Sequence, residues 1–427
     1  MTPRSTDFLE RGGAGGPAAS GSPPDADQAG RAHERGLSRR DFVARAAVAG
    51  AATIAPFSLL RQATARGSEL DAFVRAKVRA TGAPGATFAV VRGQQIVWST
   101  GVGWANIERK IRARPDTQYM LASVSKTITC AGIMSLVEDG VLDLDANINR
   151  YLPFEVRIPS APHVPITMRN LLTHTSAIRD RYNVWGTPAS DPTLYFHGDS
   201  PIPLGRFMHS YYVPGAKRYR ESNFYKRPPG KAYAYSNLAV ALAGFVAESA
   251  SGIDFDKLCR DRIAKPLGMT DSGFRLEDLS DRSNLAMPYH YNPHTGALRP
   301  FYQYGYPDYP DGAFRTSAEH LVTWLGAFMN FGKIRGKQVL SRSTVQEIRR
   351  NQIPHVVGWH QGLIWYGESP NGYFTMGHTG GDFGMTTRMF FRPDRRVGVV
   401  SLTNAYLGGD RWHAFTDVEE RLLKEFA

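Results

Sequence analysis

The sequence predicts an α+β fold, in which one antiparallel sheet built from both ends of the chain is flanked by helices and carries an inserted, mostly helical domain. Strand-like runs of apolar residues occur at 85–106, near the start, and at 372–404, near the end. The long middle, roughly 125–310, has the pattern of helices and loops and no internal repeat. Strand segments on both sides of a helical middle favour a single sheet that both ends complete.

The elements that precede the middle are a helix and a hairpin. Residues 68–80 are expected to form an amphipathic helix, because apolar side chains recur there at helical spacing: Leu70, Phe73, Val74 and Val78. Residues 85–106 are then expected to form two strands that meet at the turn 92–94.

The elements that follow the middle are three strands and a helix. Residues 372–404 predict the strands, with the last hairpin turn at 393–395. A closing helix is expected to present one apolar face, formed by Phe415, Val418, Leu422 and Phe426.

The composition is that of an ordinary globular enzyme. Of 427 residues, 42% are hydrophobic and 21% are charged. The net charge is +12, but the basic residues are scattered and form no Lys/Arg-rich run, so nucleic-acid binding is not expected. The two cysteines, Cys130 and Cys259, predict neither a disulfide framework nor a thiolate zinc site, and Cys130 is expected to be a small buried hydrophobe.

The N-terminal region is similar to a twin-arginine export signal. Arg39 and Arg40 precede an apolar stretch at 46–60, and the small residues 63–65 suit a cleavage site. We therefore expect residues 1–65 to be a disordered region plus signal peptide, which would direct the mature protein to the periplasm or outside the cell. An ordinary amphipathic helix, or an uncleaved anchor, is the alternative, and any membrane contact would be through this signal alone.

A serine and a lysine three residues apart begin a predicted helix. Ser123 and Lys126 would lie on one face of it. A serine hydroxyl is a poor nucleophile until a base takes its proton, and a lysine can do so only when it is neutral. Burial and the helix N-terminus would favour that chemistry. The alternative is a helix start with a surface lysine.

Two further motifs suggest the rest of a site. Tyr235 could share a proton with Lys126, and Asn237 could bond Lys126 and hold a substrate amide, although the same residues also suit a helix N-cap. The tripeptide His378-Thr379-Gly380 lies on a predicted strand edge, where glycine lets a substrate backbone approach. The same tripeptide at 294–296 lies in a polar turn and is expected to serve only the turn.

These three motifs, in this order, resemble those of the serine β-lactamase and D-alanyl-D-alanine carboxypeptidase superfamily, and especially the class C β-lactamases with their esterase and peptidase relatives. The resemblance covers nearly all of residues 68–427. Four other stretches support it, at 166–178, 228–237, 265–274 and 377–385.

The resemblance implies an acyl-enzyme mechanism. Ser123 would attack a carbonyl and become acylated, while Lys126 and Tyr235 would manage its proton and that of the leaving group. Asn237 would orient the substrate and Lys126. No metal and no organic cofactor would be needed.

The resemblance also implies how a substrate would be held. The backbone N–H groups of Ser123 and Gly381 would form the oxyanion hole, with Thr379 and Gly380 beside them. His378 would stand where many β-lactamases have lysine, which is similar to some D,D-carboxypeptidases and favours a peptidase. Gly381 has no hydroxyl and residues 361–376 contain no arginine, so an ester or another amide remains open as the substrate.

The resemblance further implies the domain layout and the pocket rim. Residues 66–122 and 311–427 would form the α/β part of the hydrolase, residues 66–427, and residues 123–310 its helical part. The aromatic loop 301–314 would border the pocket, so three of its side chains are expected either at the rim or packed on the surface: Tyr304, Tyr306 and Tyr309.

The expected function is that of an exported serine hydrolase, most like a D-alanyl-D-alanine carboxypeptidase or β-lactamase. A carboxylesterase of the same fold, and a penicillin- or cell-wall-fragment-binding module without turnover, are the alternatives. The expected partner is a small-molecule or peptide substrate, with cell-wall fragments among the candidates. His174, beside a predicted helix end, is expected to be structural.

Overall fold

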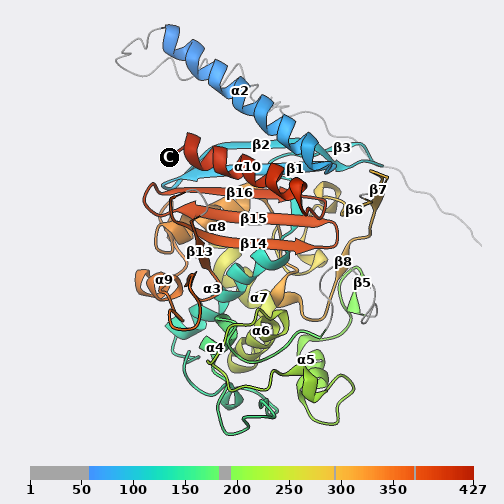
Figure 1. The fold of residues 1–427 in the computed structure, drawn as a ribbon, viewed down its shortest axis with the longest axis vertical. Helices are drawn as coiled ribbons and strands as arrows, with labels where there is room; N and C mark the ends of the chain where they lie inside the picture. The colour runs from blue at the N-terminus through green and yellow to red at the C-terminus, as the bar shows by residue number, and fades with distance from the viewer. Residues whose placement is uncertain (1–56, 182–193, 293–294, 370–371) are drawn as a thin grey trace, which may run out of the picture. The chain divides into compact units, whose positions relative to one another are not determined.

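The computed structural model describes residues 57–181, 194–292, 295–369 and 372–427 (Figure 1). The chain divides into two units, residues 1–63 and 64–427, and the fold described below is that of the second. Most of the expected export signal, including Arg39 and Arg40, lies outside the described residues.

The sheet has eight strands, all antiparallel, in the order β12-β13-β14-β15-β16-β1-β2-β3. The N-terminal strands are β1 (Gly85–Arg92), β2 (Gln95–Asn106) and β3 (Ile111–Arg112). The C-terminal strands are β12 (His360–Gln361), β13 (Tyr366–Glu368), β14 (Thr375–Asp382), β15 (Met385–Arg392) and β16 (Val397–Thr403). The predicted α+β class, with a sheet built from both ends of the chain, is confirmed.

The two ends of the chain join at the pairing of β1 with β16. Ala86 lies opposite Thr403, and the register continues to Arg92 opposite Val397. Both strands are buried almost throughout, because helices cover both faces of the sheet. Such double coverage explains why these strands are continuously apolar rather than alternating.

One face of the sheet packs on α8 (Ala318–Met329), which contacts β1 and β16. The other face packs on α10 (Asp410–Glu425) and on residues 70–78 of α2 (Phe57–Thr81). The expected helix at 68–80 therefore exists but begins earlier, at Phe57. The apolar face expected of the closing helix packs on the sheet, with Phe415, Val418 and Leu422 buried and Phe426, just beyond the last turn, partly buried.

The middle of the chain forms the helical region drawn below the sheet in Figure 1. Its helices are α3 (Ser125–Glu138), α4 (Met168–Leu172), α5 (Leu204–Tyr212), α6 (Asn237–Ser251) and α7 (Phe255–Cys259), and α9 (Arg342–Arg349) follows later. Two-stranded pairs complete the fold: β4 (Gln118–Met120) with β9 (Arg315–Ser317), β5 (Phe196–His197) with β8 (Tyr304–Gly305), β6 (Tyr289–Tyr291) with β7 (Leu298–Pro300), and β10 (Lys333–Ile334) with β11 (Lys337–Gln338). Within the described ranges no single helix could cross a bilayer, and one pair that would qualify together by length and composition, Asn237–Ser251 with Phe255–Ala264, is bent by 87°.

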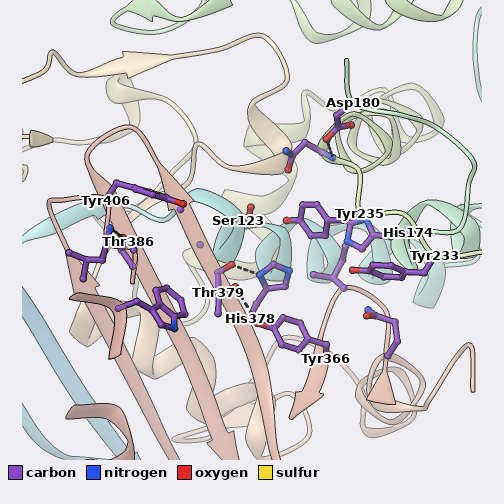
Figure 2. A pocket seen from close by; sticks show the side chains of 18 of the residues that line it. Ser123, His174, Asp180, Tyr233, Tyr235, Tyr366, His378, Thr379, Thr386 and Tyr406 are labelled. Atoms are coloured by element: carbon purple, nitrogen blue, oxygen red, sulfur yellow. Dashed lines mark hydrogen bonds between the residues drawn. The ribbon is translucent and has the colours of Figure 1, made fainter. Parts of the chain in front are cut away.

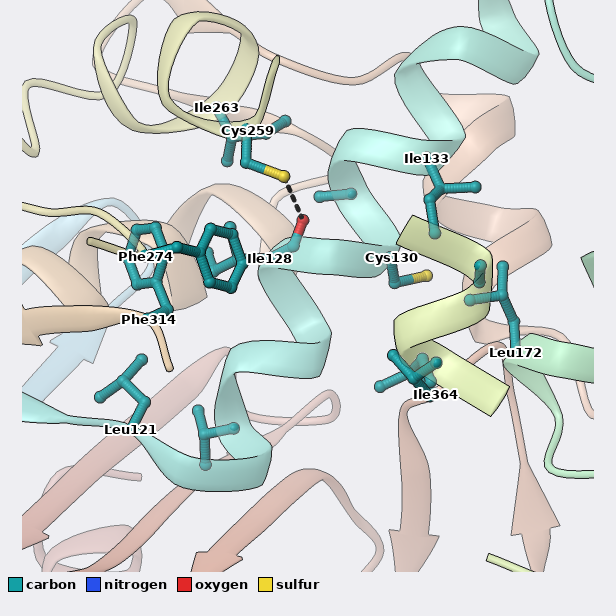
Figure 3. Close-up of a cluster of buried hydrophobic side chains, with 14 of the residues drawn as sticks. Leu121, Ile128, Cys130, Ile133, Leu172, Cys259, Ile263, Phe274, Phe314 and Ile364 are labelled. Atoms are coloured by element: carbon teal, nitrogen blue, oxygen red, sulfur yellow. Dashed lines mark hydrogen bonds between the residues drawn. The ribbon is translucent and has the colours of Figure 1, made fainter. Parts of the chain in front are cut away.

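Helix α3 is the centre of the larger core (Figure 3). Residues 125–136 are all buried, so the helix is packed on every side and not only along one stripe. A Cβ at Gly132 would lie 2.6 Å from the Cys259 Sγ, which shows how closely α7 approaches. Cys130 is buried, as predicted. The first turn of α3 carries Lys126, which this packing removes from solvent.

Candidate active site

A cleft of about 720 Å³ opens where β14, the start of α3 and the start of α6 meet (Figure 2). Ser123, Tyr235 and Asn237 line it from the helical side. Residues 378–381 line it from β14. The three sequence motifs therefore meet at one place, although the first and the last are more than 250 residues apart along the chain.

A strained turn presents Ser123 to the cleft. Ser123 lies in the 3₁₀ turn Ala122–Val124, directly before α3, and Ala122 has a positive φ of 48°. A non-glycine residue in this region costs of order 1–3 kcal/mol, and such strain is concentrated at functional sites. Strand β14 comes very close to this turn, since a Cβ at Gly380 would lie 2.4 Å from the Leu121 carbonyl oxygen and 3.1 Å from the Ser123 nitrogen. Only glycine permits that approach.

Lys126 lies fully buried beneath Ser123. Its Nζ donates to the Ser123 Oγ at 2.9 Å, to the Asn237 Oδ1 at 2.6 Å and to the Asp311 carbonyl oxygen at 2.6 Å. Burial lowers the pKa of Lys126, although the charges of nearby carboxylates, Asp311 foremost, act in the opposite direction. The alternative of a surface lysine is therefore wrong.

Tyr235 faces Ser123 across the cleft. Its ring is 38% exposed, and the ammonium of Lys126 lies 5.2 Å from the ring centroid. Desolvation raises the pKa of the phenol, and its hydrogen bond with Ser123 only partly offsets that rise. The phenol is therefore protonated at neutral pH and can pass a proton to or from Ser123.

The start of α6 is held by a carboxylate from another loop. The Ser236 hydroxyl donates to Asp180 at 2.7 Å, and the N–H groups of Asn237 and Leu238 donate to the same carboxylate at 2.6 and 3.1 Å. Ser236 is also the N-cap, accepting from the Ala239 N–H, so the N-cap interpretation of this motif is confirmed, and Asn237 contacts Lys126 from the same helix start.

His378 is buried and neutral. Its Nδ1 lies 2.6 Å from the Thr379 carbonyl oxygen, which can only accept, so Nδ1 carries the proton and Nε2 is an acceptor. Burial, followed by the charge of Lys126, lowers the pKa of His378 to about 3. The Tyr366 hydroxyl donates to the Thr379 Oγ1 at 3.2 Å and fixes the next side chain of β14.

His174 belongs to the site, which the sequence did not indicate. Its ring lies 4.3 Å from the Tyr235 ring, and its Nδ1 accepts the Ser236 N–H at 3.2 Å. His174 has a positive φ of 57° and follows α4. Burial lowers its pKa well below the ordinary histidine value, so the ring is neutral. Its contact with Tyr235 was not apparent in the sequence because the two positions are 61 residues apart.

Three carboxylates act on Lys126 from nearby, two of them buried (Asp311 and Asp382) and one partly buried (Asp308). Desolvation raises the pKa of Asp308, of Asp311 and of Asp382, the last to about 6. Within the described ranges, no group of three or more metal-ligating side chains is placed to hold a metal ion.

The three tyrosines expected at the rim are elsewhere. They are only 1%, 5% and 2% exposed, and none lines the cleft: Tyr304, Tyr306 and Tyr309. Strand β8 and the 3₁₀ turn Tyr309–Asp311 direct their rings into the core, where the Tyr304 hydroxyl donates to the Phe383 carbonyl oxygen. The same turn supplies the Asp311 carbonyl to Lys126, so this loop supports the site from below. The aromatic residues that do line the cleft are Tyr233, Tyr235, Tyr366, Tyr406 and Trp412.

A serine in contact with a buried lysine, beside a tyrosine and a glycine-containing strand, defines a serine hydrolase built on the penicillin-binding fold. The family model for Beta-lactamase matches residues 70–417, so the chain belongs to the β-lactamase family. The resemblance inferred from the three motifs is thereby confirmed.

Individual relatives are distant. The chain is 25% identical over 329 residues to the D-alanyl-D-alanine-carboxypeptidase/endopeptidase AmpH of Escherichia coli (strain K12), which covers 74% of this chain and 78% of that protein. It is 30% identical over 241 residues to the esterase EstB of Burkholderia gladioli, covering 56% and 59% of the two chains. The octameric penicillin-binding protein homologue from Pyrococcus abyssi superposes with a TM-score of 0.68 at 24% identity, over 84% of this chain and 77% of that one.

Proposed function

We propose that the protein hydrolyses an amide or ester bond through an acyl-enzyme on Ser123, as a carboxypeptidase- or β-lactamase-like enzyme. The observation that carries this proposal is the contact of Ser123 with a buried lysine. The two carbonyl oxygens beside Lys126 can only accept hydrogen bonds, so a neutral amine would donate to both and turn its lone pair to the Ser123 hydroxyl.

The reaction then proceeds in two balanced steps. The Ser123 Oγ bonds to the substrate carbonyl carbon while its proton passes to Lys126 or Tyr235. The bond from carbon to the leaving group breaks, and that proton moves to the leaving nitrogen or oxygen. Water then attacks the ester, which releases the acid and restores the Ser123 hydroxyl. The N–H groups of Ser123 and Gly381 would stabilise the oxyanion in both steps.

The substrate is proposed to be bound mainly by β14 and α6. The Asn237 Oδ1 is engaged by Lys126, which leaves the amide nitrogen to donate to a carbonyl of the acyl group. Thr379 and the neutral His378 face the cleft from β14. A carboxylesterase is the second candidate, because the described residues that line the cleft include no lysine and no arginine. The relatives named above include a carboxypeptidase and an esterase.

Mass spectrometry of the intact protein tests the nucleophile. After mixing with benzylpenicillin or with p-nitrophenyl acetate, we expect an acyl adduct in the wild type and none in Ser123→Ala. Ser125→Ala is the matched control, because Ser125 is buried in the same turn and accepts the Phe314 N–H. An adduct that survives Ser123→Ala would overturn the proposal, and one that never turns over would indicate a binding module.

We also propose that the protein is exported. Arg39 and Arg40, followed by the apolar stretch 46–60 and the small residues 63–65, support this. Fractionation of a bacterial host expressing the full chain should find the protein in the periplasm, and Arg39→Lys with Arg40→Lys should retain it in the cytoplasm. Equal export of both forms would contradict the proposal.

A further inference from the structure

The cleft extends to both sides of Ser123. In Figure 2, Tyr235, His174 and Tyr233 lie on one side of Ser123, and Thr386 and Tyr406 lie on the other. The first side is the α6 side, where Asn237 would hold the acyl group. The second side, here called the distal arm, consists of Thr386, Tyr406, Leu407 and Trp412.

The distal arm is a formed surface. The Leu407 N–H donates to the Thr386 Oγ1 at 2.9 Å, which ties the loop after β16 to β15. The Arg388 guanidinium lies 5.0 Å from the Trp412 ring centroid and is held by Glu419 of α10. Tyr406 is 44% exposed. The arm therefore offers two aromatic rings: that of Trp412, which lies against Arg388, and that of Tyr406, which is exposed.

The distal arm offers no lysine or arginine to a substrate carboxylate, and the imidazole that lines it is that of His413. No lysine or arginine of the described chain lines the cleft, and the sequence of residues 182–193 contains none either. The charge of Arg388 is matched by Glu419 and Glu368. Arg411 donates to the Thr81 carbonyl oxygen and stacks on Tyr291.

The remaining local charges also disfavour an anion. Asp410 lies in the first turn of α10 and offsets the positive end of that helix. Asp382 lies in β14, immediately after the residues that line the cleft. A carboxylate bound here would lose its hydration without gaining a lysine or arginine partner, whereas an apolar or aromatic group gains contact with two rings.

We propose that the distal arm binds an uncharged apolar or aromatic group on the leaving-group side of the scissile bond. The preferred substrate then continues past that bond or ends in a neutral group, and does not end in a free carboxylate. This inference rests on the proposed function, because the arm can select a leaving group only if Ser123 reacts.

The test uses two esters that differ in one charge, those of N-acetyl-D-alanine with D-phenyllactic acid and with D-phenyllactamide. Because they are esters, they suit a peptidase and an esterase equally. We expect kcat/KM to be at least about 10-fold higher for the amide form. We expect Tyr406→Ala and Trp412→Ala to reduce that ratio about 5-fold. Tyr406→Ala is the safer variant for folding, since Tyr406 is 44% exposed.

Two controls separate the possible failures. Trp98→Ala removes a tryptophan that packs on Phe426, beyond the last turn of α10, and should leave the ratio unchanged. Ser123→Ala should abolish hydrolysis of both esters, and if it does not, the proposed function fails. If Ser123 is required but the free acid is hydrolysed as fast as the amide, or neither arm variant changes the ratio, only the distal-arm inference fails.

Discussion

At the residue scale, the neighbours of Lys126 determine how activity should depend on pH. Only the neutral amine can accept the Ser123 proton. Burial lowers the pKa of Lys126 and so increases its neutral fraction at any given pH. Burial also keeps His378 neutral, with a pKa of about 3, and keeps the Tyr235 phenol protonated. Among these three groups, Lys126 is the one whose loss of a proton creates the base.

We therefore expect kcat/KM to rise with pH through the pKa of Lys126, with no alkaline decline from Tyr235 below a pH of about 10. His378→Gln should change the height of the pH–rate profile and not the position of its acid limb. Lys126→Arg keeps the charge but cannot lose its proton, so it should lower kcat by at least about 1000-fold. An acid limb that moves in His378→Gln would show that histidine, and not Lys126, is the titrating base.

His174 is expected to act as a positioning residue for Tyr235. It supplies a ring that packs against the Tyr235 ring and an acceptor for the Ser236 N–H. His174→Asn keeps an acceptor without the ring, and His174→Phe keeps a ring without the acceptor. We expect the Asn variant to lower kcat about 10-fold or more at little change in KM, because Tyr235 loses its support. We expect the Phe variant chiefly to lose stability, by about 1–3 kcal/mol, from the unpaired N–H. Equal kcat values in both variants would contradict a positioning role.

The sequence predicted the residues of the site better than their surroundings. Ser123, Lys126, Tyr235 and Asn237 could be found because each stands in a short motif whose spacing has a chemical reason. His174 and Asp180 could not, because their partners are about 60 residues away and no local pattern links them. The Ala-Ile-Arg-Asp segment that follows Ser176 gave no sign that Asp180 caps a distant helix.

At the element scale, strands and caps were predictable and the aromatic loop was not. β14, β15 and β16 have β-branched and aromatic residues bounded by turn residues, which are local signals. Whether the aromatic rings of 301–314 face solvent or the core depends on what packs above them. The pairing of β8 with β5 and the turn Tyr309–Asp311 direct the rings into the core. The loop sequence does not show this, because it depends on the distant segment that forms β5.

The start of α6 provides the prediction at this scale. Asp180 accepts three hydrogen bonds there, so Asp180→Ala leaves two backbone N–H groups and a hydroxyl without their acceptor. We expect a loss of about 2–4 kcal/mol in the free energy of unfolding, from the lost cap and the unpaired donors. We also expect kcat to fall about 10-fold or more, because Tyr235 and Asn237 flank this helix start.

Asp254→Ala is the matched control for this change. Asp254 stands at the N-cap of the next helix, α7, but makes no side-chain capping bond and pairs only with exposed Lys257. Its loss should change stability by less than about 1 kcal/mol and leave kcat unchanged. Similar losses of activity in the two variants would mean that Asp180 acts only through general stability.

At the scale of the whole molecule, the sheet joins distant parts of the chain. One buried ionic cluster links two of its strands to the C-terminal helix. Arg388 of β15 pairs with Glu419 of α10 at 2.8 Å and with Glu368 of β13 at 3.0 Å. Arg388 and Glu419 are both more than nine-tenths buried. The cluster also lies against Trp412, so it connects the packing of α10 to the cleft.

Removing one member of this cluster should lower the free energy of unfolding far more than removing one member of an exposed ion pair. Arg388→Met leaves two carboxylates without their cation, and we expect the free energy of unfolding to fall by about 3–5 kcal/mol. The double variant Arg388→Met with Glu419→Leu should recover part of that loss, because it also removes the Glu419 carboxylate, the more deeply buried of the two that Arg388→Met leaves unpaired. Lys424→Met, at an exposed pair with Glu420 on the same helix, should change stability by less than about 1 kcal/mol. Urea unfolding of the wild type, of these three variants and of Glu419→Leu alone measures these values. A double variant as unstable as the sum of its single changes would show that the two charges act independently and that the cluster does not join β15 to α10.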